Sequence, residues 1–330
     1  MKKVIILILL IFTIRNSEAQ FYADMLYSDI DPLSTSHIRV GNYGSGELVS
    51  GSIYNNVDSA VKYARPGSLI TIMPGQYYTK TFKIDKSLSL YCKSGVEIVG
   101  DSANRRIVIG DTVGNNGKDV NVNIKGFANF TNLSLQLFGS GVHRPIPLTQ
   151  NTLFFECNIF NAGTKSCFYW ANVKDITCKF KKAIGGSNLF DCDDYTGNAQ
   201  FEGDTVISTL SMLMNLHITN HLNIKFVNMH IVDTGNESSY IEMVFPDKSN
   251  IEFDNVSLVG INPIEFIDQH DVGSLTQWIF KNSTFNFSGD NSFLINSDYD
   301  ALLISVNSST NKPVGGYNTF APIIGDFTAP

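Results

Sequence analysis

The chain has 330 residues, 43% of them hydrophobic, and its 24 basic and 31 acidic residues give a formal net charge of −7 at neutral pH. Because phosphate binding depends on a basic surface and no cluster of Lys or Arg occurs, nucleic acid is excluded as an expected partner. The acidic balance also disfavours purely electrostatic capture of anionic glycans.

The first residues have the pattern of a secretory signal. Lys2 and Lys3 precede an apolar run over residues 4–14, and small residues follow up to Ala19. This predicts a signal peptide over residues 1–19, cleaved after Ala19, and a secreted or cell-surface protein. The run is shorter than the ~20 residues of a spanning helix, and no longer one follows, so we expect no permanent membrane span.

A short helix and two strands are predicted next. Apolar residues recur on one helical face over residues 53–64, and Pro-Gly pairs at 66–67 and 74–75 mark turns. Between and after these turns, residues 69–73 and 77–84 are expected to form strands. A helix laid over the first coil would shield the open sheet edge there.

An internal repeat follows. Phenylalanines recur with separations of 25, 25, 21, 25, 27 and 27 residues, at Phe130, Phe155, Phe180, Phe201, Phe226, Phe253 and Phe280. The position two residues before each is apolar, which indicates strands with one buried face. Asn follows two residues after Phe130, Phe226, Phe253 and Phe280, as suits a turn.

A unit of about 25 residues without a helical stripe cannot bury its own apolar face, so it must stack on copies of itself. The prediction is an all-β, right-handed parallel β-helix solenoid with an N-terminal capping helix, in which Phe stacks on Phe and Asn on Asn. The expected organisation is a lead-in over residues 20–52, the β-helix over 53–297, and a C-terminal cap, tail or assembly segment over 298–330.

The opening of the repeat region resembles a known family. The pattern A-x-P-G-x-L-I-x-I-x-P-G-x-Y, from Ala64 to Tyr77, is similar to the start of many proteins of the pectin-lyase-like superfamily. The resemblance implies a right-handed parallel β-helix. It does not imply one function, since the superfamily includes polysaccharide lyases, glycoside hydrolases, esterases, adhesins and phage tailspikes.

The five cysteines form no C-x-x-C pair, which gives no support to a metal or redox motif. They are at Cys92, Cys157, Cys167, Cys178 and Cys192. Most stand in apolar or aromatic surroundings, so buried free thiols are the expected state. A single disulfide is the alternative in an oxidising compartment.

The candidate catalytic residues are Asp191, Asp193 and Asp194. Asp191 and Asp193 alternate with inward residues on a predicted strand, which separates them by ~6.6 Å. At that distance the two carboxylates suit a shared Ca²⁺ or an acid/base pair with a water between. The alternative is an ordinary polar turn. The resemblance implies an Asp-Asp pair in polygalacturonases, which Asp193-Asp194 matches, whereas the N-T-D, G-H-G and R-I-K motifs of that branch are absent.

The candidate binding residues are Lys181, Lys182 and Tyr195. The two lysines are expected one coil below the acidic cluster, where they can assist it. Alternatively, they alternate with Glu156 and Glu202 as a surface charge ladder.

Two classes of function remain open. The first is an exported, non-catalytic surface or appendage protein whose turns bind a polysaccharide, a cell-surface glycan, a host surface or further copies of the chain as a homo-oligomer. A phage fibre or tailspike component is a variant of it. The second is a polysaccharide lyase or glycoside hydrolase using the acidic cluster, with calcium as the one candidate cofactor.

Overall fold

The structure is a computed structural model. It describes residues 37–41, 54–103, 105–110, 119–138, 151–171, 173–186, 188–193, 197–209, 213–217, 222–234, 239–244, 249–260, 265–270, 276–288, 293–297, 301–312 and 323–328. The predicted signal peptide, most of the lead-in, Asp194 and Tyr195 lie outside these residues.

The chain is wound into a solenoid with three walls, and two of them form one 18-stranded sheet. The first wall contains, in order of pairing, β1 (His37–Val40), β2 (Leu69–Ile72), β5 (Leu88–Cys92), β8 (Asn121–Gly126), β11 (Thr152–Asn161), β13 (Asp175–Gly185), β15 (Asn198–Ser208), β17 (Asn223–Val227), β20 (Asn250–Asp254), β23 (Thr276–Lys281), β26 (Ala301–Thr310) and β27 (Ile323–Thr328).

The second wall adjoins the first at a corner that we call the first corner. The long strands β11, β13, β15 and β26 run through this corner into the second wall. The remaining strands of this wall are β3 (Gly75–Thr79), β6 (Val96–Gly100), β9 (Asn129–Thr131), β18 (His230–Asp233), β21 (Ser257–Gly260) and β24 (Thr284–Phe287).

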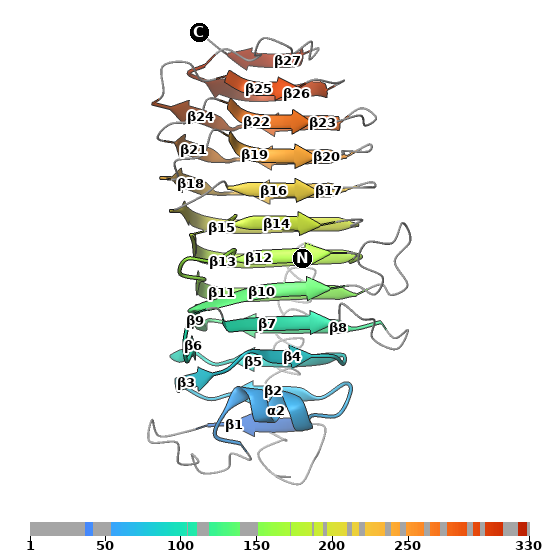
Figure 1. The fold of residues 1–330 in the computed structure, drawn as a ribbon, viewed down its shortest axis with the longest axis vertical. Helices are drawn as coiled ribbons and strands as arrows, with labels where there is room; N and C mark the ends of the chain where they lie inside the picture. Colours follow the sequence, from blue (N-terminus) through green and yellow to red (C-terminus); the bar gives the residue numbers. More distant parts are fainter. Residues whose placement is uncertain are drawn as a thin grey trace, which may run out of the picture.

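The third wall is a separate nine-stranded sheet. It contains β4 (Phe82–Ile84), β7 (Arg105–Gly110), β10 (Leu133–Phe138), β12 (Phe168–Ala171), β14 (Phe190–Asp193), β16 (Met214–His217), β19 (Ser239–Val244), β22 (Glu265–His270) and β25 (Phe293–Ser297). The pairings between the named strands are parallel, and Figure 1 shows the coils stacked along one axis in chain order. The predicted parallel β-helix is therefore confirmed.

A column of phenylalanines fills the bore. Phe201, Phe226, Phe253 and Phe280 are in register on four successive first-wall strands, and each is at most 1% exposed. Their rings stack with centroids 5.2 to 5.6 Å apart and interplanar angles of 7 to 19°. Offset stacks of this kind stabilise a core beyond their area burial.

The predicted register is wrong for the first three phenylalanines of the repeat, Phe130, Phe155 and Phe180. Phe155 pairs with Cys178, 23 residues on, and not with Phe180, because the coils on either side of β13 are shorter than 25 residues. Phe180 instead lies against Gly203, where an added Cβ would come within 2.4 Å of its ring. Phe130 belongs to the second wall and pairs with Phe160.

Asparagines with a positive φ turn the chain at the first corner. Asn228, Asn255, Asn282 and Asn307 have φ between 50 and 57°. Asn tolerates this left-handed conformation better than most residues. Asn132 also has a φ of 57° but lies between β9 and β10, where the second wall meets the third, so its predicted place on the same ladder is wrong.

The predicted helix is shorter than expected. It spans Val57–Tyr63 as α2, and the Asn56 side chain caps it by accepting a 3.0 Å hydrogen bond from the Ser59 backbone. Its apolar face, with Val57, Ala60 and Val61 buried, packs at the N-terminal end of the stack beside β1 and β2 (Figure 1).

The solenoid continues past the predicted end at Ser297. Strand β26 pairs with β23 and β24, and β27 pairs with β26. The inward positions of β26 include Ser305, Ser308 and Thr310, which are almost fully buried. Ser305 pairs with Phe280 and Thr310 with Phe285, so hydroxyl residues at these two positions hide the repeat in the sequence.

All five cysteines are buried and free. The predicted buried thiols are confirmed, and the alternative of a disulfide is not realised. Within the ranges that the structure describes, no helix has the length and apolar character needed to cross a membrane.

Candidate functional site

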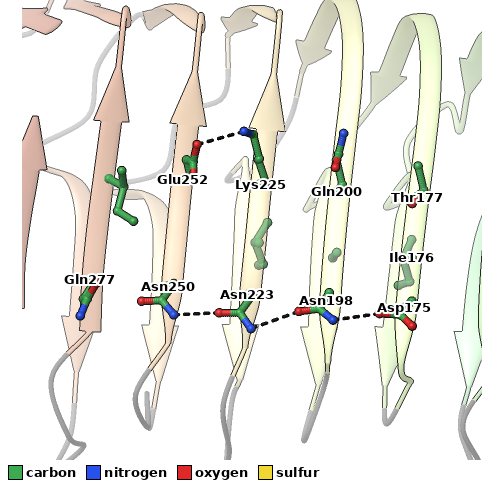
Figure 2. A pocket seen from close by; sticks show the side chains of 13 residues that line it. Asp175, Ile176, Thr177, Asn198, Gln200, Asn223, Lys225, Asn250, Glu252 and Gln277 are labelled. Atoms are coloured by element: carbon green, nitrogen blue, oxygen red, sulfur yellow. Dashed lines mark hydrogen bonds and ion pairs between the residues drawn. The ribbon is translucent and has the colours of Figure 1, made fainter. Parts of the chain in front are cut away.

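A groove runs across the outer surface of the first wall. It encloses a volume of about 560 Å³ and crosses five successive strands, β13, β15, β17, β20 and β23. Figure 2 shows its two rows of outward side chains: Asp175, Asn198, Asn223, Asn250 and Gln277 in one row, and Thr177, Gln200, Lys225 and Glu252 in the other. Strand pairing continues the second row to Ile279, which is in register with Glu252. We call the first row the amide ladder.

The amide ladder is a directed series of hydrogen bonds. Asn250 donates to Asn223 (2.8 Å) and Asn223 donates to Asn198 (3.1 Å). Asn198 donates in turn to the Asp175 carboxylate (2.9 Å), as the dashed lines in Figure 2 show. Each bond uses one of the two N–H groups of a donor and one of the two lone pairs of an acceptor. The N–H groups and lone pairs that these bonds leave unused lie along the groove, and they repeat once per coil.

Local sequence explains why these amides line up. Each stands three residues before an inward residue of the Phe column, so strand alternation directs it outward. Parallel pairing in register then places Asn198 beside Asn223 and Asn223 beside Asn250. Stacked Asn side chains with matched spacing form such ladders readily.

A charged row borders the ladder. Lys225 lies 3.0 Å from Glu252 and 3.1 Å from Asp254, and Lys281 lies 2.9 Å from Glu252. The hydrogen bond to Glu252 raises the pKa of Lys225 above its usual value. Burial acts to raise the pKa of Glu252, but hydrogen bonds from Lys281 and Lys225 outweigh it, so this pKa is lowered.

The groove is therefore built for hydrogen bonding. A carboxyl group with a lowered pKa stays ionised near neutral pH, whereas a general acid needs a raised pKa. The groove offers neutral amide donors and acceptors beside fixed, mutually neutralised charges. Such a surface suits a polar, uncharged ligand better than an ionic one.

The structure places the predicted acidic cluster on another wall. Asp191 is on β14 in the third wall, half-buried and between the buried Phe190 and Cys192, as predicted. Its neighbours in register are Tyr169 on β12 and Asn215 on β16. Asp193 ends β14, and Asp194 and Tyr195 lie outside the described residues.

The predicted binding lysines are in a different sheet from Asp191. Lys181 and Lys182 lie on β13 where it turns through the first corner. The structure does not bring them together with Asp191. The charge ladder predicted for them belongs to Lys179, which lies between Glu156 and Glu202 in register and forms a 2.8 Å ion pair with Glu202.

The calcium hypothesis gains no ligand set from the structure. Among the residues whose placement is described, no group of three or more His, Cys, Asp or Glu side chains is arranged to hold a metal ion.

Sequence reasoning missed the groove, although a signal for it was present. The ladder residues recur three positions before the column residues Cys178, Phe201, Phe226, Phe253 and Phe280. An outward Asn repeated in this way is as regular as the inward Phe and could have been found by the same search.

No protein-family model matches the chain, and neither the curated proteins nor the solved structures contain a match.

Proposed function

We propose that this chain is an exported, non-catalytic β-helix rod that binds a neutral, hydroxyl-rich polysaccharide along the groove of its first wall. The observation that carries the proposal is the amide ladder. Its free N–H groups and lone pairs repeat with the ~4.8 Å spacing of adjacent strands. A linear polysaccharide presents hydroxyls at regular intervals of comparable size, so one chain can bond to several coils at once.

Charge supports a neutral ligand. The net charge of the chain is −7, and within the groove Lys225 is held between Glu252 and Asp254. A polyanionic glycan would find no unpaired cation in this row, whereas hydroxyl groups need none.

Sequence features support export and family membership as parts of the same proposal. The apolar run over residues 4–14 after Lys2 and Lys3 suits a signal peptide, and the pattern from Ala64 to Tyr77 suits the pectin-lyase-like superfamily. A rod made of stacked coils presents one long, regular surface outside the cell.

Co-sedimentation of the purified chain with insoluble neutral and anionic polysaccharides tests the proposal. The double variant Asn198→Ala/Asn223→Ala should bind the neutral polymer at least tenfold more weakly, since several hydrogen bonds of ~0.5–1.5 kcal/mol are lost. The matched control is Asn123→Ala, because Asn123 is exposed on β8 outside the groove.

Three results would overturn the proposal. They are the absence of binding to any neutral polymer, an equal loss of binding in the control, and release of reducing ends or unsaturated uronates. If such turnover disappeared in Asp191→Ala, the second class of function, a lyase or hydrolase, would replace the rod.

A further inference from the structure

The row of polar side chains that contains the amide ladder continues beyond the groove. Strand pairing places Thr152 on β11 beside Asp175, and Asn121 on β8 beside Thr152. The Thr152 hydroxyl donates a 2.6 Å hydrogen bond to the Asn121 side chain, in the direction away from Asp175. The bonds of the amide ladder approach Asp175 from the opposite side, where Asn198 donates the last of them. The polar row therefore has a junction between Thr152 and Asp175 that neither series of bonds crosses.

Only hydrogen-bond acceptors meet at this junction. The one proton of the Thr152 hydroxyl is used in the bond to Asn121, so lone pairs remain on its oxygen. A carboxylate group only accepts, and Asp175 makes no ion pair and no second hydrogen bond among the described residues. No donor of the described chain bridges the two side chains, so the junction suits the hydroxyl groups of a ligand.

A partly exposed aromatic ring lies next to the junction. Phe154 faces outward from β11, two residues after Thr152 and in register with Thr177 of the groove. The Lys125 ammonium lies 4.8 Å from the centre of the Phe154 ring, over one of its faces. An aromatic face attracts positively polarised groups of this kind, and the C–H face of a sugar is another. No second ring or cation contacts Phe154 in the described part of the chain, which leaves exposed ring surface to a ligand.

These side chains are close enough to contact one sugar ring together. Phe154 and Thr177 lie on adjacent strands, ~4.8 Å apart, and Asp175 lies two residues before Thr177, ~6.6 Å along β13. Figure 2 shows Asp175 and Thr177 on the same strand, at the end of the groove. The Thr177 hydroxyl makes no hydrogen bond within the described residues, so it can donate to a ligand and accept from it.

The charges around the junction favour an uncharged ligand. Asp175 has no ion-pair partner among the described residues, so a carboxylate on the ligand would be repelled there. The Lys125 ammonium over Phe154 repels a cationic ligand in the same way. A hydroxyl group meets neither penalty and supplies the donor that the junction lacks.

We infer that four neighbouring side chains at the β11 end of the groove form a subsite for one neutral pyranose ring: Thr152, Phe154, Asp175 and Thr177. The ring packs its C–H face on Phe154, and two adjacent hydroxyls donate to Thr152 and Asp175. The inference rests on the proposed function and deepens it, because this ring is one unit of the glycan that the groove binds.

Saturation-transfer NMR with neutral methyl pyranosides tests the subsite without the polymer. Phe154→Ala should bind these rings about tenfold more weakly, whereas Phe154→Tyr should retain binding. Asp175→Asn should also weaken binding, because it replaces a charged acceptor by a neutral one. The matched control is Tyr78→Ala, which removes an aromatic ring that is 62% exposed on β3 and should change nothing.

The ligand can be varied in the same experiment. A pyranoside with every hydroxyl methylated keeps its ring but has no proton to donate, so it should bind about tenfold more weakly than its parent. The methyl glycoside of a uronic acid should also bind more weakly, because its carboxylate meets Asp175. Equal binding of the methylated and the parent ring would overturn the subsite.

The subsite and the groove fail in different ways. No binding of pyranosides by the unaltered chain, or unchanged binding in Phe154→Ala, overturns the subsite even where the polymer still binds. Asn250→Ala changes a ladder residue three strands from Asp175 and should leave single rings bound, and loss of ring binding in it would overturn the inference. A chain that binds the rings as expected but binds no polymer would retain the subsite and overturn the proposed function.

Discussion

The Asn198 side chain donates a 2.9 Å hydrogen bond to the Asp175 carboxylate, and the other bonds of the amide ladder point in the same direction. A chain of hydrogen bonds that ends on a charged acceptor is polarised along its length. Donation toward the carboxylate makes each amide oxygen of the ladder a better acceptor, so the Asn250 oxygen should accept a hydroxyl of a ligand more strongly than the oxygen of an isolated Asn.

The ladder should also contribute to stability. Asn223→Ala removes one bond to Asn198 and one from Asn250, both on an exposed surface, so the free energy of unfolding should fall by about 1 kcal/mol. Urea denaturation followed by circular dichroism measures this. Asn123→Ala, on an exposed strand position without such bonds, should change it by less than about 0.5 kcal/mol. Equal effects would contradict a stabilising ladder.

The phenylalanine column should dominate stability in the middle coils. The Phe253 ring lies between those of Phe226 and Phe280, and Phe253→Ala should lower the free energy of unfolding by ~3–5 kcal/mol. The milder Phe253→Leu should cost less, since it leaves a smaller cavity. Phe127→Ala serves as the exposed control and should leave the urea midpoint nearly unchanged. A small effect of Phe253→Ala would mean that the ring does not pack as described.

The first-corner turns should prefer glycine over alanine. Asn255 has a φ of 57°, which costs a residue with a Cβ ~1–2 kcal/mol. Both Asn255→Ala and Asn255→Gly lose the 2.8 Å bond to Asn228, but only the first adds the conformational cost. Thermal unfolding should rank the unaltered chain first, Asn255→Gly second and Asn255→Ala last. The reverse order of the two variants would exclude a left-handed turn.

Because of the charged row, the free energy of unfolding should depend on pH in the acidic range. The pKa of Glu252 is lower in the folded chain than its value of about 4.5 in the unfolded chain. Its contribution is therefore fully present above about pH 4.5 and is lost as the pH falls through the lower, folded pKa. The difference in unfolding free energy between the unaltered chain and Glu252→Gln should be constant at higher pH and shrink in acid. A difference that grows as the pH falls would contradict a lowered pKa of Glu252 in the folded chain.

The buried thiols should be inert while the chain is folded. Burial raises the pKa of Cys92 and of Cys167 to about 12, so neither forms the reactive thiolate at ordinary pH. Iodoacetamide should leave the native chain unmodified and add five groups after unfolding without reductant, since all five cysteines are free. Mass spectrometry counts the groups. Fewer than five after unfolding would reveal a disulfide.

The inward side of the repeat could be predicted because a large apolar residue recurs at one position. Phe226, Phe253 and Phe280 occupy equal places in coils of nearly equal length, so spacing alone gives their register. The same reasoning fails where coils shorten. Phe180 and Cys178 are both buried inward residues two positions apart, and only the pairing of Cys178 with Phe201 shows which of them is in register with the Phe column.

The outer surface was less predictable, because polar and charged residues occur there in turns, in ion pairs and in binding sites alike. The acidic residues around Asp191 attract attention as a local cluster, whereas the amide ladder is spread over five coils and becomes one surface only after folding. Lys179 and Lys181 differ by two positions in sequence, yet Lys179 forms an ion pair with Glu202, whereas Lys181 forms none among the described residues.

The hydroxyl residues on β26, next to the C-terminal strand β27, give the rod a mechanical polarity. In a solenoid, stability is a sum of terms for each coil and for each interface between coils. The middle coils share stacked rings, and the N-terminal coil is covered by α2, but β26 presents Ser305, Ser308 and Thr310 to the bore. Unravelling should therefore begin at the C-terminal end, and amide hydrogen exchange should advance from β27 through β26 toward β23. Under tension the rod would lose coils from this end, one after another, while its aromatic middle still held.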